Sequence, residues 1–436
     1  MKKGNVVALL PIGVFLCLYL GAGILFEYVL RIPQGFYHIP IVVVFLIALL
    51  VACLQNRKLS FDQKLELMGH GVGDKNIITM ILIFLTAGLF VGVAGRSSAE
   101  SVAYFLLSVF PADFAVAVLF LVSAFVSLAM GTSVGTITLI TPIALAVGKA
   151  AGFSIPLCIG TVVGGSMFGD NLSFISDTTI AACNGQGCQM KDKFRENFAI
   201  ALPAAMVALG GILLLTLGKG VERPDLPDYD LLQILPYALV LAGGVVGLNV
   251  FVVLLTGIVS GMIILLATGA ADATSLLVGM GSGVSGMFET SMVAVLVAAL
   301  CALIREYGGF DALLSGIRRL FRGKRAGQLG MGLLVGAMDI ATANNTVAIV
   351  MANPIAKEMA QVYGISPRKS ASILDTFSCI FQGVLPYGAQ MLVALTIAGE
   401  MNFEVSAFQV IPYLFYPMAL LLSSLVFIFL LPEKKK

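Results

Sequence analysis

Residues 168–179 read FGDNLSFISDTT, and this polar stretch lies between long apolar segments. It contains two carboxylates, one amide and four hydroxyl groups. An ionisable side chain at membrane depth costs about 2.5–3.5 kcal/mol on insertion scales and usually has a functional role. Oxygen ligands of this kind suit a hard cation. A cap at a helix start explains one of the two aspartates but not both, so we interpret the stretch as a buried ion site.

The composition places most of the chain in lipid. Of the 436 residues, 59% are hydrophobic and 11% are charged, whereas soluble proteins have about 45–50% and about 25%. These proportions exclude a soluble enzyme, a nucleic-acid-binding protein, a secreted disulfide scaffold and a disordered chain. Seven cysteines without a repeated CxxC motif are expected to be structural. The only histidines, His38 and His70, argue against a histidine-ligated metal or a haem, and we expect no resident cofactor.

The hydropathy pattern predicts an all-α polytopic membrane protein, because a helix needs about 20 apolar residues to cross the hydrocarbon. Ten candidate spans occur at 5–29, 40–55, 76–97, 113–149, 196–218, 231–246, 248–268, 285–304, 326–362 and 404–432. Two further stretches, 155–183 and 365–395, are apolar but interrupted by polar residues, Gly and Pro. Non-helical backbone at membrane depth occurs only where protein or water surrounds it, so we predict two re-entrant hairpins there.

The basic residues predict the orientation of the chain, because cytoplasmic loops are enriched in Lys and Arg. With the N-terminus inside, 19 of the 26 Lys and Arg residues lie inside and seven lie outside. This places both termini in the cytoplasm and the acidic linker 221–230 outside, in a multi-pass protein of the bacterial inner (plasma) membrane. The assignment requires each hairpin to return to the side from which it entered.

The two halves of the chain share a spacing of unusual residues. Thr141-Pro142-Ile143-Ala144 aligns with Asn353-Pro354-Ile355-Ala356, Gly152 with Gly364, Ser154 with Ser366 and, after a one-residue gap, Phe168 with Phe381. Each half, 1–220 and 231–436, then has five spans and one hairpin, the first entering from the cytoplasm and the second from outside. Because five is odd, this is an inverted-topology repeat, as in secondary transporters. A chance match of apolar composition is the alternative, and the shared Pro, Gly and Ser spacing disfavours it.

Polar breaks interrupt one predicted span in each half. GTSVGT at 131–136 interrupts the span at 113–149, and TANNT at 342–346 interrupts the span at 326–362. Backbone carbonyls at such a break can bind a cation, and the start of the following half-helix attracts an anion. Close packing through small residues and hydrogen bonding between helices are the alternative interpretations.

The second hairpin lacks a counterpart of the pair Asp170 and Asp177. We therefore expect the ion site in the first hairpin, while polar residues of the second half face a pore or an organic solute. Glu289 is either a proton site or a cap at the start of a span. A GxSG pattern at 283–286 matches a rhomboid-protease nucleophile motif, but no His follows position 70 to act as the base, so we expect no enzymatic activity.

These motifs resemble the NhaC-type Na⁺/H⁺ antiporter family, within the wider ion-transporter superfamily. The resemblance rests on GTSVGT at 131–136, FGDNLSFISDTT at 168–179, the basic segment after Cys188 and Asn-Asn-Thr at 344–346. It implies a carrier embedded in membrane lipid that exchanges Na⁺ for H⁺ and forms a homodimer. Relatives exchange malate for lactate or move amino acids, so the resemblance leaves a small organic solute open.

The sequence thus predicts a secondary active transporter in which a proton and Na⁺ compete for buried carboxylates during alternating access. The predicted Na⁺ ligands are Asp170, Asn171, Ser173, Ser176, Asp177, Thr178, Thr132 and Ser133. The proton-coupling candidates are Asp170, Asp177, Glu289 and Asp339, and the substrate- or pore-lining candidates are Asn344, Asn345, Thr346, Asp375, Gln382, Tyr387 and Gln390. The alternatives are an Na⁺- or H⁺-coupled carrier of an amino acid or small carboxylate, and a channel that conducts without coupling.

Overall fold

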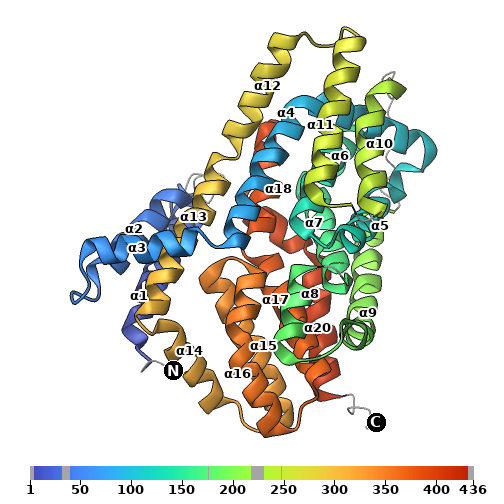
Figure 1. Ribbon diagram of the computed structural model, residues 1–436. Coiled ribbons are helices and arrows are strands. Elements are labelled where there is room, and N and C mark those ends of the chain that lie inside the picture. The colour runs from blue at the N-terminus through green and yellow to red at the C-terminus, as the bar shows by residue number, and fades with distance from the viewer. Residues whose placement is uncertain (1–3, 32–39, 175, 218–229, 247, 431–436) are drawn as a thin grey trace.

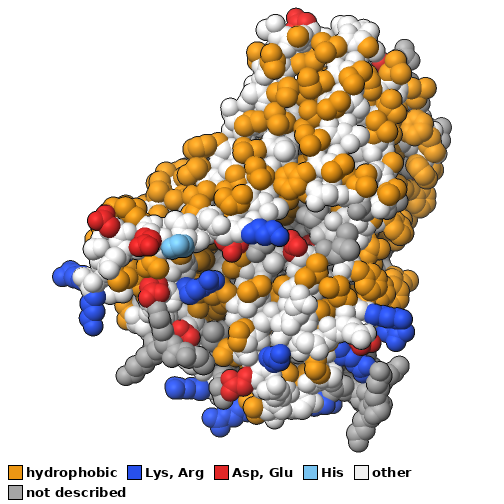
Figure 2. Space-filling model, in the orientation of Figure 1, with side chains coloured by type: hydrophobic (Ala, Val, Ile, Leu, Met, Phe, Trp, Pro, Cys, Tyr) orange, Lys and Arg blue, Asp and Glu red, His pale blue; other side chains and the backbone are white. Residues whose placement is uncertain are grey.

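The computed structural model describes residues 4–31, 40–174, 176–217, 230–246 and 248–430, and every regular element among them is helical. Seven of these helices are long and apolar enough to cross a membrane, and two bent pairs raise the number to nine. This confirms the predicted all-α polytopic membrane protein. Figure 2 shows hydrophobic side chains over the upper part of one face and Lys and Arg in its lower half, as expected for a protein surrounded by lipid.

The first half contains a helical hairpin. The hairpin consists of α5 (Ala112–Met130) and α6 (Ser133–Ala151). The next helix of the chain is α7 (Ile155–Leu172). Gly165 of α7 packs against Phe120 of α5, and Gly169, one turn later, packs against Ala124. Contacts in this order mean that α5 and α7 run in the same direction, so α6 between them runs in the opposite direction. The chain therefore reverses at Gly131, between α5 and α6.

The second half contains a matching hairpin. The hairpin consists of α15 (Lys324–Thr342) and α16 (Asn345–Tyr363). The next helix of the chain is α17 (Pro367–Val384). Gly327, near the start of α15, packs against Tyr363 at the end of α16, and Gly330 packs against Met359. Contacts in this reversed order make α15 and α16 antiparallel, with the tip of the hairpin at Ala343.

The helices α7 and α17 each continue through a short break into a second helix. The second helices are α8 (Asp177–Gln186) and α18 (Ala389–Glu400). Together, α17 and α18 form one apolar unit of 34 residues, Pro367–Glu400. In Figure 1, α8 lies below α7 and packs against α16 and α17, while α18 lies above α17 and packs against α6. Each second helix therefore reaches the hairpin of the other half.

This arrangement differs from the sequence expectation in the role of four segments. The sequence predicts hairpins at 155–183 and 365–395, whereas the structure has broken helices there. It predicts broken spans at 113–149 and 326–362, whereas the structure has hairpins there. The predicted fold class, with two hairpins and two broken helices, is retained, but the segments exchange roles.

Backbone angles explain the exchange. Gly131 and Ala343 have positive φ angles of 69° and 47°, and a single left-handed residue of this kind ends a helix and turns the chain away from its axis. The breaks after α7 and α17 are instead flanked by extended residues, such as Ser173 with φ −66° and ψ 139° and Leu385 with φ −62° and ψ 120°. An extended residue carries the chain onward. Hydropathy shows where polar residues interrupt a span, but it does not show whether the chain then reverses or continues.

The helix bounds recur at a constant interval in the two halves. The helices α15, α16 and α17 have the same lengths as α5, α6 and α7, and one sequence offset superimposes all six bounds. This offset aligns Asp170 with Gln382. It is the same for all three pairs of helices, so the one-residue gap that the sequence comparison introduced to align Phe168 with Phe381 is not needed. The side of the membrane that each half faces stays a prediction, as does the linker 221–230, of which only Asp230 lies within the described residues.

The other helices surround these two repeats. They are α1 (Leu10–Ile24), α2 (Ile41–Leu54), α3 (Phe61–Val72), α4 (Lys75–Val109), α9 (Met190–Thr216), α10 (Leu231–Val246), α11 (Val250–Ala267), α12 (Ala273–Gly286), α13 (Phe288–Glu306), α14 (Gly309–Leu320), α19 (Ala407–Val410) and α20 (Phe415–Phe429), with short elements η1 (Val6–Leu9), η2 (Leu25–Val29) and η3 (Ile411–Tyr413). Gly88 and Gly92 of α4 pack so closely against the backbone carbonyls of Gly283 and Gly279 that an added Cβ would clash with them. The Gly-rich segment of α12 is thus a surface for close helix packing.

Candidate functional site

Asp170 lies in the last turn of α7 and is 5% exposed. Ser133 Oγ donates a hydrogen bond to one carboxylate oxygen at 2.7 Å, and Ser176 Oγ donates to the other at 2.5 Å. Ser133 begins α6, and Ser176 is the last residue before α8. The carboxylate of Asp170 therefore joins the tip of the first hairpin to the broken helix of the same half.

Hydrogen bonds continue from this carboxylate into the second half. Gln390 Nε2 donates to Ser133 Oγ at 3.1 Å, although the two residues are 257 positions apart in the sequence. Gln382 Nε2 donates to Gln390 Oε1 at 2.9 Å and to the carbonyl oxygen of Ala343 at 2.9 Å. Because Ala343 is the tip of the second hairpin, this chain of hydrogen bonds connects the tips of both hairpins to Asp170.

A cavity of about 90 Å³ lies against this network. Its polar lining consists of Asp170, Gln382, Thr79 of α4 and residues at four helix starts, namely Thr132 and Ser133 at α6, Ser176, Asp177 and Thr178 at α8, Asn344, Asn345 and Thr346 at α16, and Gln390 at α18. Thr132 and Asn344 cap their helices, because each side chain accepts a hydrogen bond from the backbone of the first turn. A helix start carries a partial positive charge, which offsets the charge of Asp170. The hydroxyl, amide and carboxylate oxygens can bind a hard cation.

The cavity brings together most of the residues that the sequence singles out. The sequence assigns Gln382 and Gln390 to a separate solute site, but the structure joins them to Asp170 through Ser133. The candidates that do not line the cavity are Asn171, Ser173, Glu289, Asp339, Asp375 and Tyr387.

Asn171 and Asp375 belong to a separate buried cluster. Lys193, near the start of α9, forms an ion pair with Asp375 of α17. Its Nζ also donates to the carbonyl oxygen of Asn171 and to Thr179 Oγ1, each at 2.8 Å. Asn197 Nδ2, one turn further along α9, donates to Asn171 Oδ1 at 2.7 Å. The ammonium group thus lies among three oxygens that come from both halves of the protein.

Sequence reasoning missed Lys193 and Asn197. They lie in the segment KDKFREN at 191–197, before an apolar span, where basic residues ordinarily mark the cytoplasmic end of a helix. Their spacing of four residues places both side chains on one face of α9. This shared helix face is the only feature of the sequence that indicates a buried role for Lys193 and Asn197.

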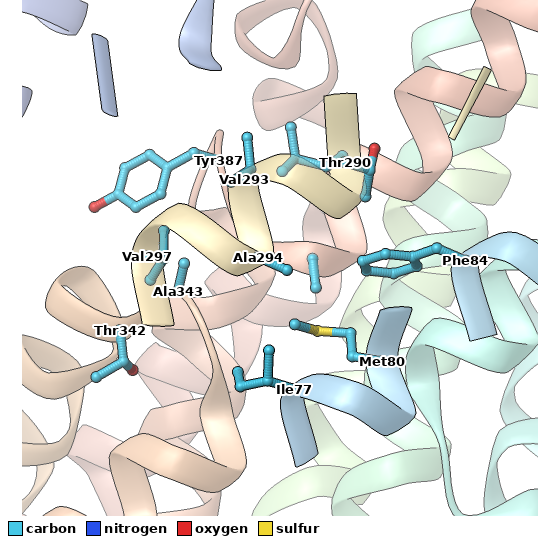
Figure 3. A pocket seen from close by; sticks show the side chains of 12 residues that line it. Ile77, Met80, Phe84, Thr290, Val293, Ala294, Val297, Thr342, Ala343 and Tyr387 are labelled. Atoms are coloured by element: carbon cyan, nitrogen blue, oxygen red, sulfur yellow. The ribbon is translucent and has the colours of Figure 1, made fainter. Parts of the chain in front are cut away.

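The other residues outside the cavity have different surroundings. Glu289 is exposed in the first turn of α13, and the residue at the N-cap of this helix is Met287, without a side-chain cap hydrogen bond. Tyr387 is buried, donates its hydroxyl to the Ile340 carbonyl at 2.8 Å and lines a small apolar pocket with Met80 and Phe84 of α4 (Figure 3). Ser173 is buried in the break after α7.

Comparison with known protein families assigns the chain to one of them. The model of the Na⁺/H⁺ antiporter family matches residues 8–219 and 231–431, which include both hairpins, both broken helices and every residue of the cavity lining. The chain belongs to the Na⁺/H⁺ antiporter family. It is therefore a multi-pass protein of a family of membrane transporters, and the resemblance to NhaC-type proteins is confirmed.

Individual relatives are distant. The chain is 26% identical over 231 residues to the malate-2H(+)/Na(+)-lactate antiporter of Bacillus subtilis, covering 52% of this chain and 46% of that protein. It is 23% identical over 355 residues to the Na(+)/H(+) antiporter NhaC of the same species, covering 72% and 77%. The chain thus spans about half the length of the first of these relatives. The Alcanivorax borkumensis YdaH transporter is a solved structure with a TM-score of 0.47 and 17% identity, covering 89% of this chain and 97% of that one.

Proposed function

We propose that the protein exchanges Na⁺ for H⁺ by alternating access, with both ions competing for Asp170. The observation that carries this proposal is the Asp170 carboxylate, held by two serine hydroxyls and facing a polar cavity between two helical hairpins. Burial in a medium of low dielectric disfavours an uncompensated carboxylate, so either a bound proton or a bound Na⁺ stabilises the site. Asp177, which lines the same cavity, is a second carboxylate that contributes to cation binding.

The hairpins and broken helices are the moving parts in this proposal. The tips of the two hairpins, near Thr132 and Asn344, meet in the cavity. The contacts of α8 with α16 and of α18 with α6 couple the two halves, so that one hairpin closes as the other opens. The long helices α4, α9 and α13 serve as the scaffold against which these elements move.

The exchanged roles of the segments strengthen the proposed orientation. With hairpins at α5–α6 and α15–α16, Lys149 moves to the outside, while Lys357, Arg368 and Lys369 move to the inside. The number of basic residues inside then rises from 19 to 21 of 26, in better agreement with the enrichment of Lys and Arg in cytoplasmic loops. We therefore propose that both termini are cytoplasmic and that the protein lies in the bacterial plasma membrane. The proposed homodimer is tested by light scattering of the purified protein.

A second candidate function is Na⁺-coupled transport of a small carboxylate. Four helix starts face one cavity, and helix starts favour an anion such as a carboxylate group. The name of the Bacillus subtilis relative, which pairs Na⁺ with lactate and two protons with malate, supports the same class of solute. In this version, Asp170 holds Na⁺ while the helix starts hold the carboxylate of the solute.

Reconstitution of the purified protein into liposomes tests the first function. The vesicles enclose a pH-sensitive dye, and Na⁺, Li⁺ or K⁺ is added outside. We expect Na⁺ to drive proton efflux for the wild type and for Asp113→Asn, a matched control at the start of α5 outside the cavity. We expect no response for Asp170→Asn, although this variant inserts normally. An unchanged Na⁺ response in Asp170→Asn would refute the assignment of the site.

A thermal-shift screen separates the two candidate functions. Lactate, malate and amino acids are added to the purified protein with and without Na⁺. Stabilisation by a carboxylate that requires Na⁺ supports the solute carrier. Stabilisation by Na⁺ alone, with no effect of any solute, supports simple cation exchange.

A further inference from the structure

Asp339 is a buried carboxyl group that the proposed exchange at Asp170 does not use. It lies in the last turn of α15, before the tip of the second hairpin, and is 0% exposed. Ser378 Oγ of α17 donates a hydrogen bond to Oδ1 at 3.1 Å. The other oxygen, Oδ2, has no hydrogen-bond partner among the described residues.

No cation compensates Asp339 within the described part of the chain. Tyr387 and Cys301 lie nearby, but their hydroxyl and thiol donate to the backbone carbonyls of Ile340 and Ala341. The titratable groups that face it from α17 are Asp375 and Cys379. The first of these is already paired with a lysine. An ionised carboxylate here would be buried, lacking one donor and facing a second carboxylate, so the neutral acid is the stable form.

The repeat sets Asp339 apart from Asp170. At the offset that superimposes the helix bounds of the two halves, Asp339 aligns with Ser127, and Ser378 aligns with Ser166. In the first half, Ser127 Oγ donates to the carbonyl oxygen of Ser166 at 2.6 Å, so the same two positions form a neutral contact there. Asp170 in turn aligns with Gln382, which is neutral. Asp170 and Asp339 therefore occupy different positions in the repeat, and each aligns with a neutral residue of the other half.

The two acids also differ in what they can bind. Asp170 lines a cavity of about 90 Å³ with many oxygen ligands. Asp339 does not line that cavity, and the nearest link is Ser378 Oγ, which also lies 3.5 Å from the carbonyl oxygen of Asn345 in the cavity wall. A site of one carboxyl group with an unpaired oxygen suits a proton rather than a Na⁺ ion, which needs several oxygen ligands.

We propose that Asp339 is a second proton-carrying residue, separate from the cation site, and that it exchanges its proton when the tip of the second hairpin moves away from α17. Each cycle then moves one proton from Asp339 in addition to the proton that Na⁺ displaces from Asp170. The inference rests on the proposed Na⁺/H⁺ exchange and specifies the second acid. With two protons for one Na⁺, the exchange carries net charge.

Two transport assays on the full-length protein in liposomes separate this inference from the proposed function. Exchange of radioactive ²²Na⁺ for unlabelled Na⁺ needs no net proton movement, whereas the ratio of H⁺ to Na⁺ measured at reversal of flux counts the protons. We expect Asp339→Asn to retain ²²Na⁺/Na⁺ exchange and to lose one proton per cycle and its dependence on membrane voltage. Asp170→Asn loses both activities. A second variant, Asp339→Ser, has the residue found at the matching position of the first half.

Infrared difference spectroscopy provides a readout without transport. A protonated carboxyl group gives a carbonyl-stretch band. The spectra are recorded at saturating Na⁺, where Asp170 is ionised and gives no such band. We expect the band in the wild type and in Asp170→Asn but not in either Asp339 variant. A wild-type H⁺ to Na⁺ ratio in both Asp339 variants, or the persistence of the band, overturns the inference while leaving Na⁺/H⁺ exchange intact. Loss of ²²Na⁺/Na⁺ exchange in the folded Asp339 variants also overturns it, because Asp339 would then belong to the cation site. Absence of Na⁺-linked proton movement in the wild type overturns both proposals.

Discussion

The buried ion pair between Lys193 and Asp375 leads to a quantitative prediction. Replacing Lys193 with Met keeps most of the side-chain volume but removes the ammonium group. Among the described residues, Asp375 then keeps only the hydrogen bond from Asn197 Nδ2 at 3.3 Å. The carbonyl oxygen of Asn171 and Thr179 Oγ1 also lose their shared donor.

The expected cost follows from burial. The side chains of Lys193 and Asp375 are 1% and 2% exposed, and removing one partner of such a pair destabilises a protein by about 3–5 kcal/mol. Lys149 and Glu100 form a matched control pair at 3.3 Å, with side chains 58% and 25% exposed. Exposed pairs contribute about 0–1 kcal/mol, so Lys149→Met is expected to have a small effect.

Equilibrium unfolding in mixed micelles, followed by circular dichroism, measures these free energies. We expect Lys193→Met to lower the free energy of unfolding by several times more than Lys149→Met. The double variant Lys193→Met/Asp375→Leu is expected to recover most of the loss, because an apolar pair of similar volume often replaces a buried ion pair at little cost. Equal losses for the two single lysine variants, or a double variant no more stable than Lys193→Met, would show that the buried charges do not act as a pair.

Three further predictions follow from the hairpins and the Asp170 site. Ser133→Ala removes a donor to the Asp170 carboxylate and so favours the protonated acid; the pH profile of Na⁺ uptake is expected to shift to more alkaline pH, and an unchanged profile contradicts the hydrogen bond's role. Gly131→Ala introduces a Cβ at φ 69° and is expected to destabilise the protein by about 1–2 kcal/mol. Ala343→Gly removes a Cβ at φ 47° and is expected to stabilise it. Thermal unfolding of both variants checks that the two changes in stability have opposite signs. Single cysteines at 149 and 357 in a cysteine-free background are expected to react with an impermeant maleimide from the outside and from the cytoplasmic side respectively, and the reverse pattern supports the roles assigned from hydropathy.

Several features of the site were predictable from local sequence. Asp170, Ser176 and Asp177 stand out because carboxylates and hydroxyls interrupt apolar segments, and such residues are costly in lipid unless they have a function. The repeat was visible because Pro, Gly and Ser recur at one spacing, and the helix bounds of the two halves follow the same spacing. These inferences needed only residue type and distance along the chain.

Other features required coordinates. Lys193 and Asp375 are 182 positions apart, and no local pattern pairs them. Gln382 and Gln390 join the Asp170 network only because α18 packs against α6.

The sequence by itself determined that the chain is a bundle of membrane helices with two polar breaks in each half. The tertiary structure alone decided which break reverses the chain and which carries it onward. The physical reason is that hydropathy depends on the transfer of side chains from water to lipid, which is the same for either direction of the chain. The direction depends instead on backbone angles, left-handed at Gly131 and Ala343 and extended at Ser173 and Leu385, and these angles persist because packing between distant helices holds them.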